Sequence, residues 1–114
     1  MELKIEKELF QWEKNRFVFI EGENAPIVSS VQFFNKKSSR AIEVDVLGGK
    51  ARIPNSLLKE SLPIVALACK GRLDESQVIA RREFKVLKRP MPENYYEDPS
   101  SDSKEVIYDG GVET

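Results

Sequence analysis

Histidine is absent from the sequence, which removes the side chain that most often transfers protons in enzymes. The Ser-His-Asp and Cys-His nucleophile systems, and any zinc site with a histidine ligand, are therefore excluded. The sequence also contains no glycine-rich phosphate-binding loop and no nucleophile elbow. We therefore expect that the protein is not an enzyme and has no catalytic residue, no metal and no cofactor.

Cys69 is the single cysteine, so an internal disulfide cannot form, and one cysteine cannot build a structural zinc or iron–sulfur site. It lies in the apolar run PIVALACKG, and no neighbour in the sequence marks a thiolate. We predict that Cys69 is a small buried hydrophobic residue rather than a reactive thiol.

Glu43 and Asp45 are two residues apart in RAIEVDVLGG, where Ile42, Val44 and Val46 alternate with them. This period places the apolar side chains on one face of a strand and the two carboxylates on the other. Such a pair can form a weak cation site, but no glycine-bracketed acidic loop surrounds it. Solvated surface charge is the favoured interpretation.

Basic residues cluster near the end of the apolar part of the chain. They are Arg81, Arg82, Lys85, Lys88 and Arg89. On one strand, Arg81, Lys85 and Arg89 would share a face that can contact phosphates, protect an exposed sheet edge, or pair with an acidic segment of this or a neighbouring chain. Because the chain is only mildly basic here and no stacking platform accompanies the row, we expect no nucleic-acid partner.

Six aromatic residues precede the middle of the chain: Phe10, Trp12, Phe17, Phe19, Phe33 and Phe34. Aromatic faces can stack on sugar rings, but a small sandwich needs about this many rings to fill its core. We expect most of them to be core. Trp12 is the exception, because it lies in the polar turn FQWEKNR and is expected to be partly exposed at an interface.

In the elements that must position these residues, apolar and polar side chains mostly alternate. Strands are predicted at 3–9, 15–22, 28–34, 42–46, 50–53, 62–70 and 78–88. Gly48-Gly49 predicts a tight turn. The sole helical candidate is a short turn in PNSLLKES, capped by Asn55 or Ser56, with Leu57 and Leu58 against the sheet.

About seven short strands with almost no helix predict an all-β fold. We expect an antiparallel, Ig-like β-sandwich over residues 1–90 with one short helical turn, and a closed barrel remains the alternative. No run approaches the roughly 20 apolar residues of a membrane span, so no membrane partner is expected.

Composition changes at Arg89-Pro90-Met91-Pro92, where two close prolines favour an extended exit from the domain. Residues 91–114 are predicted to be an extended acidic C-terminal arm. Residues 93–114 hold seven acidic residues and one basic (net −6), whereas residues 1–92 hold 17 basic and 12 acidic (net +5). Tyr95, Tyr96, Ile107 and Tyr108 are unusual for a solvated tail, so we expect the arm to order against another surface.

Four segments together resemble a small β-sandwich domain of phage and prophage virion structural proteins from Gram-positive bacteria. They are ELFQWEKNRFV, VQFFNKKSSRAIEV, ARIPNSLLKESLPIVALA and FKVLKRPMPENYYED, within roughly residues 3–98. The most specific part is the exit Lys88–Pro92 followed by Tyr95-Tyr96-Glu97.

The resemblance implies a virion protein, made in the bacterial host cytoplasm, of the baseplate, tail-fibre, head-fibre or capsid-decorating type. Its expected partners are itself, as a homo-oligomer and specifically a trimer, and other virion proteins of the capsid or baseplate. Because this chain ends soon after its arm, a small decoration or adaptor protein is favoured over a full fibre.

Three functional hypotheses follow. The first is the virion subunit, the second a carbohydrate-binding receptor-recognition module of a phage tail, and the third a nucleic-acid-binding barrel. The residues expected to make interactions are Trp12, Arg81, Arg82, Lys85, Lys88, Arg89, Tyr95, Tyr96, Ile107 and Tyr108.

Overall fold

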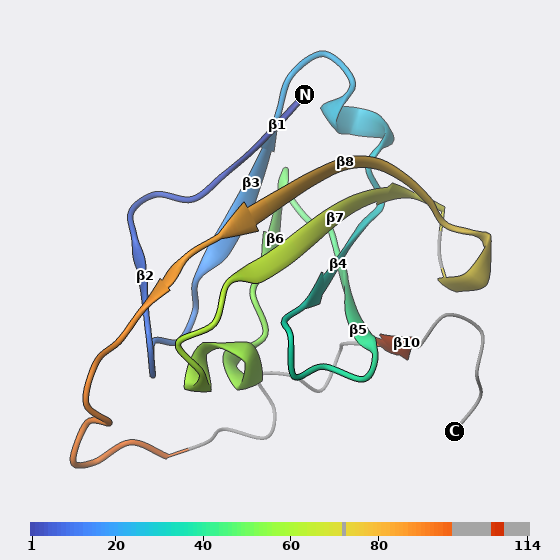
Figure 1. Ribbon diagram of the computed structural model, residues 1–114. Helices are drawn as coiled ribbons and strands as arrows, with labels where there is room; N and C mark the ends of the chain where they lie inside the picture. The colour runs from blue at the N-terminus through green and yellow to red at the C-terminus, as the bar shows by residue number, and fades with distance from the viewer. Residues whose placement is uncertain (72, 97–105, 109–114) are drawn as a thin grey trace.

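Strands dominate the computed structural model, which describes residues 1–71 and 73–96 and the backbone of residues 106–108 (Figure 1). One antiparallel sheet has the order β1 (Glu2–Lys4), β3 (Phe17–Glu21), β6 (Lys50–Arg52). A second antiparallel sheet has the order β10 (Val106–Tyr108), β5 (Ala41–Asp45), β4 (Ser30–Phe34), β7 (Ile64–Lys70), β8 (Gln77–Phe84). The predicted all-β sandwich is confirmed.

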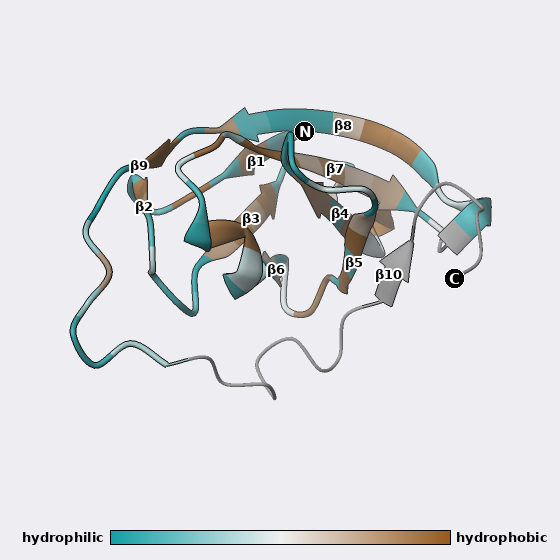
Figure 2. Cartoon of the chain, turned by 60° about the horizontal axis from the view of Figure 1, so that its bottom comes forward, coloured by the Kyte–Doolittle hydropathy of each residue, from teal (hydrophilic) through white to brown (hydrophobic). Residues whose placement is uncertain are grey.

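Short elements connect and extend the two sheets. β2 (Leu9–Phe10) and β9 (Val86–Leu87) pair in parallel. The described helical turns are all 3₁₀: η1 (Ala25–Ile27), η2 (Asn55–Lys59) and η3 (Leu73–Glu75). Figure 2 shows hydrophobic residues in strands such as β3 and β5, whereas much of β8 is hydrophilic.

The hydrophobic core lies between the sheets and is centred on β4 and β7. Val31 and Phe33 of β4 face the core, where they oppose Ala68 and Ala66 of β7 in register. The small alanines leave room for the Phe33 ring, which is fully buried. Large and small side chains therefore interdigitate across these strands.

The two sheets contact each other at two places, since β1 contacts β8 and β5 contacts β6. Between β1 and β8 the connection is made by a side chain. Arg82 Nη1 donates a hydrogen bond to the Leu3 carbonyl oxygen (2.7 Å), and its guanidinium lies 5.2 Å from the centre of the Phe84 ring. Arg82 therefore bridges β1 and β8 at this edge of the sandwich.

Each predicted strand is present, but two are divided. The segment 3–9 forms β1 only as far as Lys4, and its end belongs to β2; the segment 78–88 becomes β8 and β9 on either side of Lys85. The division allows β9 to turn away from β7 and pair with β2. The predicted helical turn is present as η2 with Leu57 and Leu58 buried, but the capping prediction was wrong. Pro54 occupies the cap position, and no side chain makes a capping hydrogen bond.

The aromatic core is smaller than expected. Of the six rings assigned mainly to the core, Phe33 alone is buried, and Phe84 is a second buried ring. Phe17 and Phe19 are half-buried because the inward positions of β3 belong to Val18 and Ile20. Small aliphatic side chains therefore fill core space that we expected aromatic rings to occupy.

Glu43 is the clearest correction to the sequence analysis. It was expected to be solvated, but only 1 % of its surface is exposed. β5 lies between β10 and β4, so Glu43 has Val106 on one side and Gln32 on the other. Gln32 Nε2 donates hydrogen bonds to Glu43 Oε1 (3.5 Å) and Ser76 Oγ (3.1 Å). The outer face of the larger sheet therefore holds a buried polar layer.

Adjacent phenylalanines of β4 provide a test of the packing. Phe33→Ala is expected to lower the free energy of unfolding by about 3–5 kcal/mol, because it opens a cavity in the core between the two sheets. Phe34→Ala, on the opposite face of the same strand and only half-buried, should cost clearly less. Urea unfolding measures both, and equal losses would contradict this assignment of the core face.

Candidate functional site

The short parallel pair of β2 and β9 brings the beginning and end of the folded body together. Leu9 pairs with Val86 and Phe10 with Leu87, and both Leu9 and Val86 are buried. The chain therefore leaves β9 directly beside the turn that follows β2 (Figure 1). We call the contacts among Gln11, Trp12, Lys14, Arg89, Tyr95 and Tyr96 the exit corner.

Gln11 connects three segments at the exit corner. Its backbone N–H donates to the Leu87 carbonyl (2.9 Å), and its side-chain Nε2 donates to the Lys59 carbonyl (2.9 Å). Its side-chain Oε1 accepts from the Arg89 backbone N–H (3.1 Å), and its carbonyl accepts from Arg89 Nε (2.8 Å). These bonds hold the end of β9, the turn after β2 and η2 in one arrangement.

Trp12 has a left-handed backbone (φ 70°), which turns its ring toward the exit. Its backbone N–H donates to the Leu58 carbonyl (2.8 Å), and its indole Nε1 donates to the Arg89 carbonyl (3.1 Å). The edge of Tyr95 meets the indole ring with centroids 5.2 Å apart at an interplanar angle of 68°. The indole is thus half-buried between the body and the exiting chain.

Lys14 holds the two tyrosines of the exit. Its Nζ lies 4.7 Å from the Tyr95 ring centroid and 4.1 Å from that of Tyr96, and it donates a hydrogen bond to the Tyr96 carbonyl. Both ring contacts are within the range of cation–π attraction. The Tyr96 residue nevertheless remains 70 % exposed.

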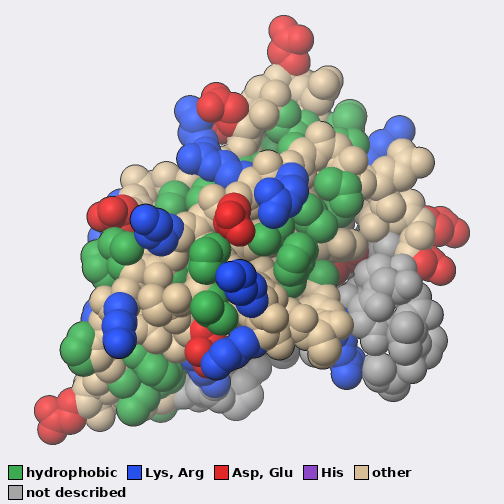
Figure 3. Space-filling model, viewed as in Figure 1, with side chains coloured by type: hydrophobic (Ala, Val, Ile, Leu, Met, Phe, Trp, Pro, Cys, Tyr) green, Lys and Arg blue, Asp and Glu red, His purple; other side chains and the backbone are tan. Residues whose placement is uncertain are grey.

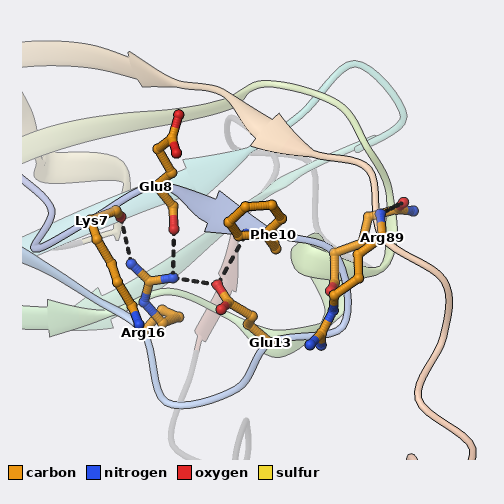
Figure 4. Close-up of polar contacts among 7 residues, drawn as sticks. Lys7, Glu8, Phe10, Glu13, Arg16 and Arg89 are labelled. Carbon is orange, nitrogen blue, oxygen red and sulfur yellow. Dashed lines mark hydrogen bonds and ion pairs between the residues drawn. The ribbon is translucent and has the colours of Figure 1, made fainter.

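Arg16 supports the turn that carries Trp12 (Figure 4). Its guanidinium donates to the carbonyls of Lys7 (2.6 Å) and Glu8 (3.0 Å) and forms an ion pair with Glu13. Glu13 Oε1 also accepts from the Phe10 backbone N–H (3.0 Å). Because both charged side chains are largely buried, this pair fixes the loop between β2 and β3 more firmly than an exposed ion pair would.

The structure unites four of the residues singled out from the sequence, namely Trp12, Arg89, Tyr95 and Tyr96. Sequence reasoning missed Gln11, Lys14 and Arg16, although the Glu13–Arg16 spacing of three was a readable signal. Ile107 and Tyr108 lie elsewhere, in β10, where they pair with Ile42 and Ala41 of β5. Their side chains lie outside the described part of the chain.

The basic residues do not form the single continuous face that was expected. β8 ends at Phe84, and Arg89 turns back onto Gln11. Arg82 donates to Leu3 at the sandwich edge and is exposed, as are Arg81, Lys85 and Lys88. Figure 3 shows Lys and Arg side chains distributed over the face that β7 and β8 present in Figure 1, interspersed with hydrophobic and acidic groups.

A polar hollow of about 450 Å³ opens between the loop 35–40 and η2. Lys37 and Glu60 form an ion pair there (3.1 Å). Within the described residues no aromatic ring lines this hollow, so it lacks a sugar-stacking platform. In the same described portion, no group of three or more metal-ligating side chains occurs.

The chain matches no protein-family model, and searches of curated proteins and of solved structures gave no match. Within residues 1–71, 73–96 and 106–108, none of the helices has the length and apolar character needed to cross a bilayer.

The sole tryptophan reports on the exit corner. Tyr95→Leu removes the ring that packs edge-on against Trp12, so we expect greater hydration of the indole and a red shift of its fluorescence emission. Tyr96→Leu is the matched control, because the Tyr96 ring is largely exposed, and its spectrum should stay close to that of the parent. Equal shifts in the two variants would contradict the Trp12–Tyr95 contact.

Cys69 is fully buried, as predicted, and its thiol donates a weak hydrogen bond to the Leu67 carbonyl (3.4 Å). Burial raises the pKa of this thiol, and the Glu43 carboxylate raises it further. Because the thiol pKa is raised in the folded state, this group contributes to the stability of the fold. The contribution is complete at pH values below the thiol pKa of the unfolded chain, about 8.5, and is lost as the pH rises from there through the folded-state pKa.

We expect native Cys69 to resist a thiol-specific disulfide reagent at pH 8 and to react fully once urea unfolds the chain. Met91→Cys provides the control, since residue 91 is 58 % exposed and its added thiol should react at once. Rapid labelling of Cys69 in the folded parent would contradict its placement.

Proposed function

We propose that the protein is a non-enzymatic structural subunit of a phage virion, which self-associates and docks on the particle through its C-terminal arm. The observation that carries the proposal is β10. Its three residues extend the larger sheet by pairing antiparallel with β5, in the register Val106 with Glu43, Ile107 with Ile42 and Tyr108 with Ala41. Strand addition of this kind is a common means of protein association, because backbone hydrogen bonds supply much of the affinity.

The exit corner fixes the point from which the arm departs. Trp12 and Lys14 hold Tyr95 and the Tyr96 carbonyl against the body, and β10 lies on the far side of the molecule in Figure 1. Nine residues, 97–105, join the two points in sequence. The same strand pairing can be made with β5 of its own chain or of a neighbour, which is the basis of exchange between identical subunits.

Charge supports association through the arm. Residues 93–114 carry net −6 and residues 1–92 net +5, so the arm of one copy is attracted to the body of another. Exposed Arg81, Lys85 and Lys88 contribute to this basic surface. Because such attraction is screened over about 8 Å at physiological ionic strength, association should weaken as salt is added.

The resemblance to virion domains favours a baseplate, fibre or capsid-decorating subunit, with itself and other virion proteins as partners. The exit Lys88–Pro92 and Tyr95-Tyr96, on which the resemblance mainly rests, is also the segment that packs at the exit corner. A structural use for this motif is therefore favoured.

A carbohydrate-binding tail module is the second candidate, and the exposed ring of Tyr96 is the observation that favours it. Against it, Trp12 is already engaged by Arg89 and Tyr95, and Lys14 lies over both tyrosine rings. A glycan array would distinguish the two candidates, since specific glycan binding abolished by Tyr96→Ala would support the module.

Ile107→Pro tests the proposal, because proline within β10 removes a backbone N–H donor and disfavours strand pairing. In the full chain we expect a smaller oligomer by light scattering and loss of the protein from virions purified from the bacterium that encodes it. Ser101→Pro, in the arm but outside β10, is the matched control and should retain both properties. A parent chain that is absent from purified virions and remains monomeric at high concentration would overturn the proposal.

A further inference from the structure

One end of the sandwich carries an uncharged surface, which we call the hairpin-end patch. It consists of η1 with the following residue and the tip of the β5–β6 hairpin, residues 25–28 and 46–49. These segments read APIV and VLGG, without a charged residue, in a chain whose residues are 32 % charged. Uncharged apolar surface gathered in one place is typical of a protein contact.

The patch combines a protrusion with a hollow. Leu47 is 72 % exposed at the hairpin tip, and Ile27 is 49 % exposed on η1. Beside them is a hollow of about 340 Å³, lined by Ala25, Pro26, Val28, Val46 and Gly49. A branched aliphatic side chain and an apolar recess therefore lie on the same patch.

Backbone hydrogen bonds hold the patch in place. Leu47 and Lys50 exchange N–H to carbonyl bonds (2.9 and 3.3 Å) across Gly48 and Gly49, whose φ values of 62° and 76° suit the predicted tight turn. The Val46 N–H donates to the Ser29 carbonyl (3.1 Å), which ties the hairpin to the segment after η1. A preformed surface loses little conformational entropy on binding.

We propose that the hairpin-end patch is where two copies of this chain associate about a two-fold axis, with Leu47 of each copy entering the hollow of the other. This inference rests on the self-association in the proposed function and names the contact that mediates it. In a two-fold contact the same patch meets itself, so protrusion and recess must lie on one surface, as they do here.

The lack of charge in these two segments allows a second copy as the occupant. A two-fold contact sets residues near the axis against their own counterparts, so a patch of one sign repels itself, whereas an uncharged patch does not. The other exposed apolar pair, Val78 and Ile79 of β8, is followed by Arg81 and Arg82 and is less suited to such a contact. That strand suits an acidic partner instead.

The patch is separate from the strand edge used by the arm. β10 pairs with the side of β5, whereas the patch occupies the turn beyond its end. A ring of subunits built by arm exchange can therefore be joined to a second ring by two-fold contacts, giving dihedral symmetry. The expected trimer would then become a hexamer.

Leu47→Asp in the full chain tests this contact. At a concentration where the parent is associated, we expect the mass measured by light scattering or sedimentation to halve, with self-association weakened at least about tenfold. Ile27→Asp should act in the same direction, and Leu47→Met should retain the parent mass. Met91→Asp is the matched control, because it introduces the same charge at an exposed apolar residue outside the patch.

Unfolding in urea verifies that each variant is folded. Unchanged mass in both Leu47→Asp and Ile27→Asp, with a mass lowered by Ile107→Pro, would overturn the patch contact and leave the arm proposal standing. A parent that is monomeric at every concentration would also overturn the patch contact, while its presence in purified virions would separately support the proposed function.

Discussion

The hydrogen bonds of Gln11 are the interaction on which the arrangement of the exit depends. Its amide and backbone join the end of β9, the Arg89 side chain and η2, so that segments nearly 80 residues apart in sequence are held together. Trp12 directly follows Gln11 and contacts Arg89 and Tyr95 at the same corner. An apolar residue in place of Gln11 would leave the Arg89 N–H and the Lys59 carbonyl without these partners, and the direction of the arm would no longer be defined.

Alternation along the chain was sufficient to predict the all-β fold, because apolar and polar residues alternate clearly in strands such as β4 and β5. It could not predict where a strand changes partner. The separation of β8 from β9 at Lys85 follows from pairing with β2, a contact across the whole chain. The half-buried rings of Phe17 and Phe19 were misjudged for a related reason, since the total volume needed in the core depends on how closely the two sheets approach.

The residues of the candidate site could be predicted in part from their types. Trp12, Tyr95 and Tyr96 stood out because large aromatic residues in polar segments need a surface to pack on. Gln11 and Lys14 did not stand out, since a glutamine or a lysine in a turn is ordinary until its distant partner is known. Glu43 was placed wrongly because its strand appeared to have one solvated face. That strand is an interior one, between β4 and β10, and β10 belongs to a region whose composition indicated only an arm.

The near-zero net charge of the chain arises from unlike regions, and these suit different kinds of contact. An acidic arm and a basic body attract one another between copies, which speeds encounter and makes association sensitive to salt. The hairpin-end patch, built from residues without charge, suits contact with an identical surface and should be insensitive to salt. If both operate, added salt would first release the arms and leave pairs joined by Leu47. The order in which the contacts are lost would then separate strand exchange from patch association within a single titration.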